Sequence, residues 1–270
     1  MKKIAPTADF VYPHVQFSPW ILSLKFRNDY MYDIAIIGGS LSGLICAVKL
    51  SKDYNVCIID INQEIGFPTN FPGISKDIKL IKNFLESEDL SNLYLKQNID
   101  YWGMRSEWLV KYLTQLSAKS GVKILNRTRV SNIFFEDYFN IEIIGGGPQN
   151  KIITSKIIID ETEQIHLGPG EKNHTTQLQN KRIIKLENDF SNYFSGIIPT
   201  KKSQNFNNSI LRIERNDGLI EIWFKEQPKE DINWIEIKNC KSPSEKGPMI
   251  IDDYFIRSDK ILNEVNKILT

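Results

Sequence analysis

An α/β fold is predicted for this chain, with a parallel sheet in its first half and a smaller antiparallel sheet in its second half. Three observations predict it. Residues 32–66 read as strand, glycine turn, helix and strand, the order of a parallel βαβ unit. Short apolar runs separated by turn residues continue through the second half. With 270 residues, the chain is long enough to bury a substantial core in one or two domains.

The first strand, its turn and the second strand are typical of a dinucleotide-binding unit. Residues 33–37 are a short apolar run of the kind that forms a buried parallel strand, and residues 38–43 lead directly into a helix. The second buried strand, residues 56–59, is followed by Asp60, 22 positions after Gly38. An acid at this spacing favours a Rossmann-like dinucleotide site over a glycine turn in an unrelated α/β domain.

Each position of the turn has an expected role. Gly38 turns the chain sharply out of the strand, and Gly43 lets the helix pack closely on the sheet. Backbone N–H groups at the helix start, together with the helix dipole, bind the diphosphate, and Asp60 accepts hydrogen bonds from the adenosine ribose. Ser40 replaces the middle glycine of the pattern, a small departure. The expected cofactor-binding residues of this unit are Gly38, Gly39, Ser40, Leu41, Ser42, Gly43 and Asp60.

Two further runs of sequence indicate a family. Residues 60–68 read Asp-Ile-Asn-Gln-Glu-Ile-Gly-Phe-Pro, and residues 101–109 read Tyr-Trp-Gly-Met-Arg-Ser-Glu-Trp-Leu. These runs, and the strand within residues 121–130, resemble FAD-dependent oxidoreductases of the geranylgeranyl reductase and aromatic-ring monooxygenase group. The resemblance implies FAD rather than NAD as the bound dinucleotide. It also implies that Arg105, just before a helix, and Val130, near the adenine, belong to the cofactor site.

The chain departs from this group in two places. Where the group closes its domain with Asp-Ala-Thr-Gly or Ala-Asp-Gly, residues 160–163 read Asp-Glu-Thr-Glu. Glu163 therefore replaces the closing glycine and is expected to bring a negative charge toward the diphosphate. The chain also has no late Gly-Asp segment followed by an alanine- and glycine-rich helix, which in the group holds the ribityl chain and the flavin. Recognition of adenosine and diphosphate is therefore better supported than a complete flavin pocket.

Apolar spacing predicts the elements that follow the first unit. Two amphipathic helices are expected at residues 77–86 and 106–120. A small antiparallel meander is expected next. Its glycine run, residues 145–147, is interpreted as a hairpin loop rather than a second phosphate site, because no helix follows it. The expected strands of the meander are residues 130–135, 139–144 and 151–155.

The second half is expected to contain a smaller antiparallel sheet and a closing helix. Residues 216–218 read Asn-Asp-Gly, which indicates a tight turn between two strands. Ile220, Ile222 and Phe224 alternate, so one face of their strand is expected to be covered. Trp223 is interpreted, like Phe224, as a core residue. The expected strands are residues 181–186, 209–215, 219–225 and 232–239, and the expected helix is residues 258–270.

Three regions are therefore expected. Residues 1–30 are an N-terminal extension with three prolines and no signal-peptide layout; its aromatic residues could instead cover the domain or a partner site. Residues 31–165 are a Rossmann-like FAD/NAD(P)-binding domain. Residues 166–270 are an antiparallel β region of the substrate-binding type with a C-terminal helix. The resemblance implies that this second sheet walls a substrate cavity above the flavin.

Composition argues against several partners and chemistries. The net charge is +1 with both signs mixed, so no nucleic-acid partner is expected. No run of apolar residues is long enough for a transmembrane segment. Cys46, Cys57 and Cys240 form no disulfide framework, and a cytoplasmic location is expected. A metal site is not expected from the few histidines, which are His14, His166 and His174.

Two functions from different classes are compatible with these features. The first is an FAD-dependent oxidoreductase in which flavin hydride acts on a small, apolar, isoprenoid-like substrate, with NAD(P)H as a candidate electron donor. No catalytic residue can be named for it. The alternative is a shortened, non-catalytic or partner-dependent nucleotide-binding protein, in which a separate chain could complete the flavin site. A weaker third option is an NAD(P)H-linked dehydrogenase without flavin.

Overall fold

The structure is a computed structural model, and it describes most of the chain. The described residues are 30–162, 178, 180–187, 189–202, 206, 208–228, 233–243 and 247–269. The expected N-terminal extension lies outside them except for Tyr30, as do Glu163 and all three histidines.

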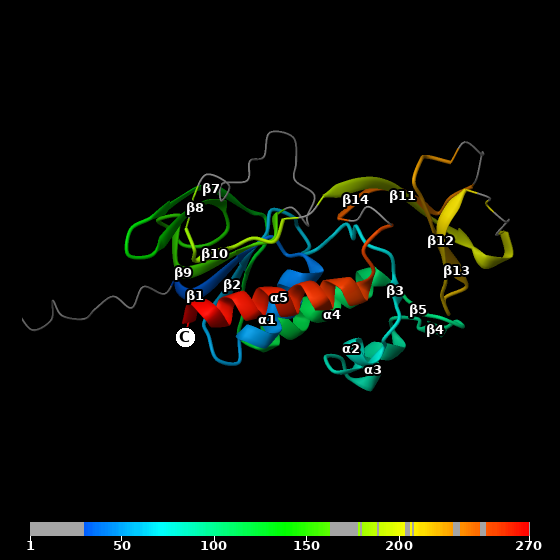
Figure 1. The fold of residues 1–270 in the computed structure, drawn as a ribbon, viewed down its shortest axis with the longest axis horizontal. Coiled ribbons are helices and arrows are strands. Elements are labelled where there is room, and N and C mark those ends of the chain that lie inside the picture. Colours follow the sequence, from blue (N-terminus) through cyan, green and yellow to red (C-terminus); the bar gives the residue numbers. More distant parts are fainter. Residues whose placement is uncertain are drawn as a thin grey trace, which may run out of the picture.

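A large mixed sheet organises the first half (Figure 1). Its order is β6-β2-β1-β9-β8-β7, with β10 paired to β9. The pairs among β6, β2, β1, β9 and β10 are parallel, whereas β7, β8 and the start of β9 form the antiparallel meander. The strands are β1 (Met31–Ile37), β2 (Val56–Ile59), β6 (Lys123–Leu125), β7 (Thr128–Phe135), β8 (Phe139–Gly145), β9 (Ile152–Asp160) and β10 (Ile183–Ile184).

Alternate residues of β1 pack on opposite faces of this sheet. Ile34 and Ile36 belong to the core beneath the helices, whereas Ala35 and Ile37 belong to a second core that the meander covers. The strand is therefore buried on both faces, as a continuous apolar run in a parallel sheet predicts. The helices on the first face are α1 (Leu41–Leu50), α4 (Ser106–Lys119) and α5 (Ile251–Leu269).

A small three-stranded sheet and two short helices follow β2 along the chain. The expected helix of residues 77–86 forms only one turn before Asn83, and a second short helix begins at Ser87. Its apolar residues Ile78, Ile81 and Leu85 are nevertheless buried. The elements are β3 (Ile74–Ser75), α2 (Lys79–Lys82), α3 (Ser87–Ser91), β4 (Lys96–Gln97) and β5 (Trp102–Gly103).

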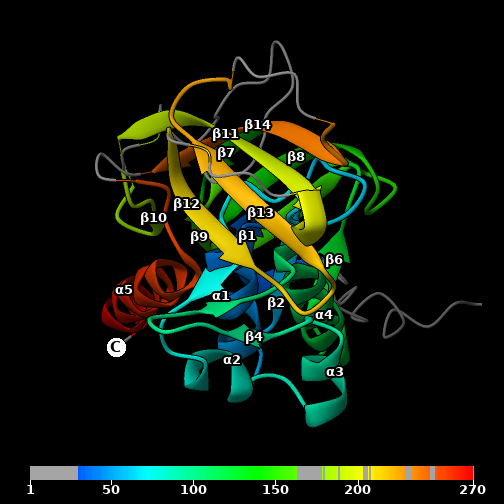
Figure 2. The same cartoon turned by 90° about the vertical axis from the view of Figure 1, so that its right-hand side faces the viewer.

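A four-stranded antiparallel sheet lies at the other end of the molecule from the meander (Figures 1 and 2). Its order is β12-β13-β11-β14, and Ile220, Ile222 and Phe224 share one covered face, as expected. The opposite face buries Trp223 with Ile74 of β3. The elements are β11 (Phe190–Pro199), the 3₁₀ turn η3 (Thr200–Lys202), β12 (Ser209–Glu214), β13 (Leu219–Phe224) and β14 (Glu236–Pro243).

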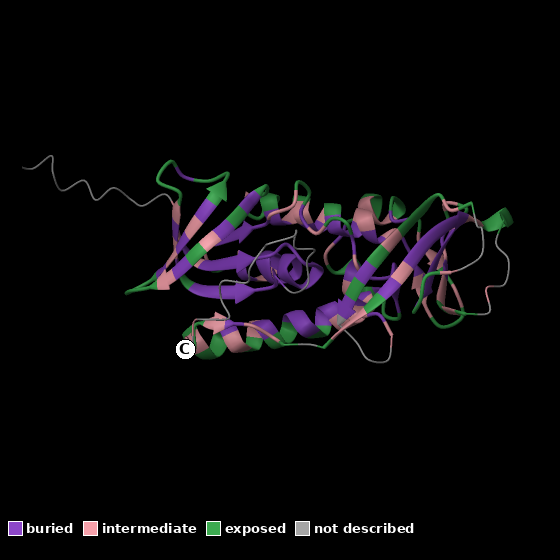
Figure 3. Ribbon diagram, turned by 90° about the horizontal axis from the view of Figure 1, so that it is seen from above, coloured by how far each residue is buried: buried purple, intermediate pink, exposed green. Residues whose placement is uncertain are grey.

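The structure divides the second half differently from the sequence-based expectation for residues 166–270. Strand β10 joins the large sheet beside β9, and α5 packs on α1. Helix α5 also begins at Ile251 rather than at residue 258, because Ile251, Tyr254 and Phe255 extend its buried face. Figure 3 shows the buried and exposed residues alternating along this C-terminal helix. The antiparallel sheet is therefore an insertion between two elements that complete the first domain.

Candidate functional site at the glycine turn

The glycine turn lies at the carboxyl ends of the parallel strands, where open α/β sheets bind their ligands. The N–H of Gly38 donates to the carbonyl of Ile59 at 2.8 Å, and the N–H of Glu161 donates to that of Ile37 at 2.8 Å. Gly38 has φ +98°, and a Cβ there would lie 2.8 Å from the backbone of Glu161. The ends of β1, β2 and β9 thus meet within hydrogen-bond distance of one another.

Ser40 is the N-cap of helix α1. Its hydroxyl accepts a hydrogen bond from the N–H of Gly43 at 2.9 Å, and its carbonyl accepts one from Leu44. A Cβ on Gly43 would lie 3.0 Å from the carbonyl oxygen of Gly38 and 3.3 Å from Ile36. The glycine at this position therefore lets the helix lie close to the strand.

Asp60 is directed at the turn from the end of β2. One carboxylate oxygen accepts from the N–H of Gly39 at 2.6 Å, and the other accepts from the N–H of Asn62 at 2.7 Å. The residue is 1% exposed, and burial raises the pKa of its carboxyl above the usual range. The side chain of Ile65 packs on Gly39, where an added Cβ would meet it at 2.2 Å. Asp60 therefore holds the turn itself and is covered from solvent.

Glu161, directly after β9, fills the space in front of the helix start. One oxygen of its carboxylate, Oε2, accepts from the hydroxyls of Ser40 at 2.7 Å and Ser42 at 2.6 Å. The other, Oε1, accepts from Nη2 of Arg257 at 2.8 Å and from its Nε at 3.1 Å. The side chains of Glu161 and Arg257 are 1% and 6% exposed. The glycine turn is thus closed by a buried ion pair that joins β9 to α5.

A dinucleotide does not fit these residues as they lie. A diphosphate at a helix N-terminus binds to turn amides and nearby hydroxyls, with space for its oxygens. Here the amides of Gly39 and Gly43 donate to Asp60 and Ser40, and the hydroxyls donate to Glu161. All residues from 38 to 43 are buried under this arrangement. The structure therefore disagrees with the FAD that the sequence resemblance implies.

Two of the expected cofactor residues are not part of this arrangement. Arg105 is the N-cap residue of α4. Its guanidinium lies 5.9 Å from the ring centre of Tyr94 and 6.0 Å from the ring centre of Trp108. Its Nε lies 4.0 Å from a carboxylate oxygen of Asp217. Val130 is buried in the core beneath the meander. The structure thus places Arg105 at the junction with the antiparallel sheet and Val130 in packing.

The sequence interpretation overlooked both members of the ion pair. Glu161 stands where the Asp-Ala-Thr-Gly closing pattern has alanine, so the larger acidic side chain was a readable signal. Arg257 is a charged residue on the buried face of α5, in the row of Tyr254, Ile261 and Val265. A lone arginine in such a row indicates a buried acceptor, although the sequence does not say which one.

A second charged cluster joins α4 to the antiparallel sheet. The ammonium of Lys238 donates to the hydroxyl of Thr69 at 3.0 Å and lies 3.8 Å from the carboxylate of Glu107. Glu221 on β13 accepts from the indole N–H of Trp223, and burial raises the pKa of its carboxyl. These contacts lie between α4 and the antiparallel sheet.

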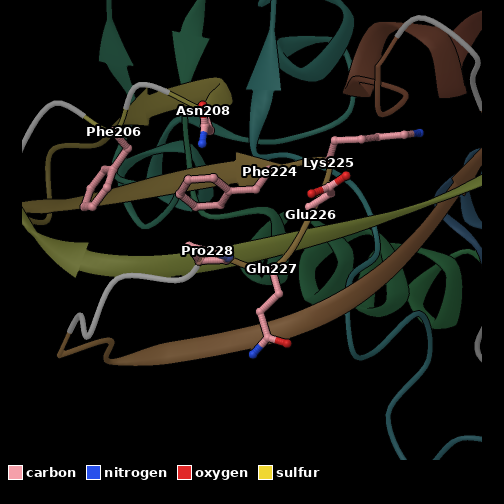
Figure 4. A pocket seen from close by; sticks show the side chains of 7 residues that line it. All are labelled: Phe206, Asn208, Phe224, Lys225, Glu226, Gln227 and Pro228. Atoms are coloured by element: carbon pink, nitrogen blue, oxygen red, sulfur yellow. The ribbon is translucent and has the colours of Figure 1, made fainter.

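A hollow of about 430 Å³ lies on the other face of this sheet (Figure 4). The rings of Phe206 and Phe224 form its aromatic wall, with centroids 5.9 Å apart. The amine of Lys225 turns away from it and lies 4.5 Å from the ring centre of Tyr193. Because successive residues of a strand point to opposite faces, Phe224 faces away from Trp223 and β3. The hollow is thus separate from the glycine turn.

Several solved structures share the fold of this chain. A geranylgeranyl bacteriochlorophyll reductase-like protein from Thermoplasma acidophilum aligns over 79% of this chain and 66% of its own, with TM-score 0.54 and 13% identity. Glycine oxidase from Geobacillus kaustophilus aligns over 81% and 85%, with TM-score 0.52 and 9% identity. p-Nitrophenol 4-monooxygenase from Pseudomonas putida aligns over 79% of this chain and 67% of its own, with TM-score 0.50 and 10% identity. No protein-family model and no curated protein matches the sequence.

These likenesses confirm the expected fold, that of the reductase and monooxygenase group, with its parallel sheet, meander and antiparallel sheet. All three proteins carry the names of redox enzymes. At 9–13% identity the likeness shows the fold alone, and the chain spans 66% of the reductase-like protein. In the part of the chain that the structure describes, no helix is long and apolar enough to span a bilayer.

Proposed function

We propose that this chain is a non-catalytic or partner-dependent derivative of a flavin-type oxidoreductase and works without a dinucleotide in its glycine turn. The carboxylate of Glu161 carries the proposal, because it accepts both serine hydroxyls at the start of α1. A bound diphosphate would have to displace a side chain that is also paired with Arg257 at 2.8 Å. Breaking a buried ion pair leaves an uncompensated charge, which is strongly unfavourable.

Features away from the turn also support this proposal. On the face of the antiparallel sheet toward β3, Trp223 and Tyr193 are packed together with Ile74 and Cys240. A Cβ on Gly73 would lie 3.1 Å from the carboxylate of Glu221, so backbone and sheet are in close contact there. Packing of this kind supports a structural role for the surface at which a substrate would otherwise meet the flavin.

The visible absorbance spectrum of the purified full-length chain tests this function. We expect colourless protein that does not quench the fluorescence of added FAD, because the hydroxyls of Ser40 and Ser42 already donate to Glu161 and the N–H of Gly39 already donates to Asp60. A yellow protein with bound flavin, or saturable quenching at one FAD per chain, would contradict the proposal. Titration with NADH, followed by nicotinamide fluorescence, separates the third option, since a flavin-free dehydrogenase would bind it.

The second candidate is an FAD-dependent oxidoreductase acting on a small apolar substrate. One observation favours it: Gly38 and Asp60 end neighbouring parallel strands at the edge where such folds bind dinucleotides. In this case flavin would supply the redox chemistry, with NAD(P)H as electron donor and a separate chain completing the flavin site. An isoprenoid-like substrate and a cytoplasmic location belong to this candidate as proposals.

A further inference from the structure

We infer that the hollow of about 430 Å³ on the antiparallel sheet binds an organic cation carried on an apolar or aromatic body. The aromatic rings of Phe206 and Phe224 line this hollow together with the carboxylate of Glu226. Amines, amidines and quaternary ammonium compounds are ligands of this class. The inference goes beyond the proposed function, because the hollow lies on the face of the sheet turned away from β3 and is separate from the glycine turn.

The aromatic wall of the hollow is held in place by the chain itself. Phe224 lies on β13 and is 2% exposed. The backbone carbonyl of Phe206 accepts hydrogen bonds from the N–H and the hydroxyl of Ser209, at 3.2 and 2.9 Å. The indole of Trp234 stacks on the ring of Phe206, and a Cβ added to Gly196 would lie 2.4 Å from this indole. The two phenylalanine rings are therefore positioned before any ligand binds, which lowers the entropic cost of binding.

The rings of Phe206 and Phe224 suit a cation better than an anion. They meet edge to face, with an angle of 79° between their planes and centroids 5.9 Å apart (Figure 4). Because the face of an aromatic ring is negative, it attracts a cation that lies within about 6 Å of the ring centre. The volume of the hollow also falls within the range of about 300–1,000 Å³ that is usual for small-molecule sites. There is thus room for the apolar body of the ligand as well as for its charge.

The charges around the hollow favour a cation as well. Two charged residues line it among those that the structure describes, Lys225 and Glu226. Figure 4 shows the ammonium of Lys225 directed away from Phe224, and it lies 4.5 Å from the ring centre of Tyr193. The side chain of Glu226 is exposed and makes no hydrogen bond or ion pair with another described residue. Its carboxylate is therefore available to attract a positive charge, and it repels a negative one.

Calorimetric titration of the full-length chain with benzamidine, benzamide and benzoate tests the inference. These probes are planar rings of nearly equal size, and near neutral pH they are a cation, a neutral molecule and an anion. We expect benzamidine to bind at least about tenfold more tightly than benzamide, because the rings and the carboxylate of Glu226 act on its charge. Benzoate is expected not to bind measurably.

Three variants locate the binding site. Glu226→Gln keeps the volume of the side chain, so it should reduce the preference for benzamidine over benzamide about two- to fivefold and leave benzamide binding unchanged. Phe206→Leu removes one aromatic face but keeps an apolar side chain, and it should weaken benzamidine binding about fivefold. Glu236→Gln is the matched control: this exposed glutamate of β14 does not line the hollow, so all affinities should stay at their wild-type values.

No binding of benzamidine, or equal affinities for benzamidine and either of the other probes, would overturn the inference. So would benzamidine binding that Glu226→Gln and Phe206→Leu both leave unchanged, because the probe would then lie elsewhere. If Phe206→Leu does not fold, Glu226→Gln decides the question, since it alters a single exposed side chain. Failure of the proposed function has a different readout, FAD bound by the wild-type protein, and these probes do not report on it.

Discussion

At the scale of single residues, the buried pair of Glu161 and Arg257 carries the proposal that the glycine turn holds no dinucleotide. Burying an isolated carboxylate costs much free energy. The burial of the Glu161 carboxylate therefore depends on the guanidinium of Arg257 and on the two serine hydroxyls. All four side chains are at least nine-tenths buried, so solvent screens their interactions little. The pair therefore gives the turn a fixed occupant that comes from the chain itself.

Removing the guanidinium should destabilise the protein by about 3–5 kcal/mol, because Arg257→Met leaves the Glu161 carboxylate buried without a counter-charge. The double variant with Glu161→Gln should lose much less than the sum of the two single variants, since neither charge is then left alone. Urea unfolding of the four proteins measures both quantities. A loss below about 0.5 kcal/mol in Arg257→Met would show that the pair does not hold the turn.

Residue types and spacing were enough to predict which residues form the turn. Gly38, Ser40 and Gly43 lie at the end of β1 and the start of α1, and Asp60 is directed at them from β2. Spacing could not show that Arg257, far along the chain, would pair with the Glu161 carboxylate in front of them. Contacts between distant segments depend on how helices pack, which local patterns do not determine.

At the scale of elements, strong patterns were predicted and weak ones were not. The buried run of β2 and the helix α4 are found within a residue or so of their expected bounds. Strand β11 was missed because it contains Asn192 and Gly196, residue types that are depleted in strands. Gly196 is needed there, since a Cβ would lie 2.4 Å from the ring of Trp234. Tertiary contact thus overrides local preference at that strand.

Helix α5 should contribute to stability through its apolar face on α1. Ile261 is 1% exposed, so Ile261→Ala should cost about 2–5 kcal/mol by leaving a cavity in the core. Ile256, 55% exposed on the same helix, is the control, and Ile256→Ala should stay within about 0.5 kcal/mol of wild type. Thermal unfolding measures the two losses. Losses of equal size in both variants would mean that α5 does not dock on this face.

At the scale of the whole molecule, the sequence predicted the fold, and the fold alone does not determine the chemistry. The order of strand, turn, helix and strand, followed by a meander, was expected from the sequence, and the solved structures that share the fold confirm it. Function resides in the site rather than in the fold. Here one acidic side chain at the end of β9 and one basic side chain on α5 form a buried ion pair in front of the glycine turn.

A crystal structure of the protein grown with excess FAD tests the central claim most directly. The account predicts that the Glu161 carboxylate lies within hydrogen-bond distance of the hydroxyls of Ser40 and Ser42, with no dinucleotide at the start of α1. A diphosphate bound to the amides of that helix, with Glu161 turned out of the site, would contradict it.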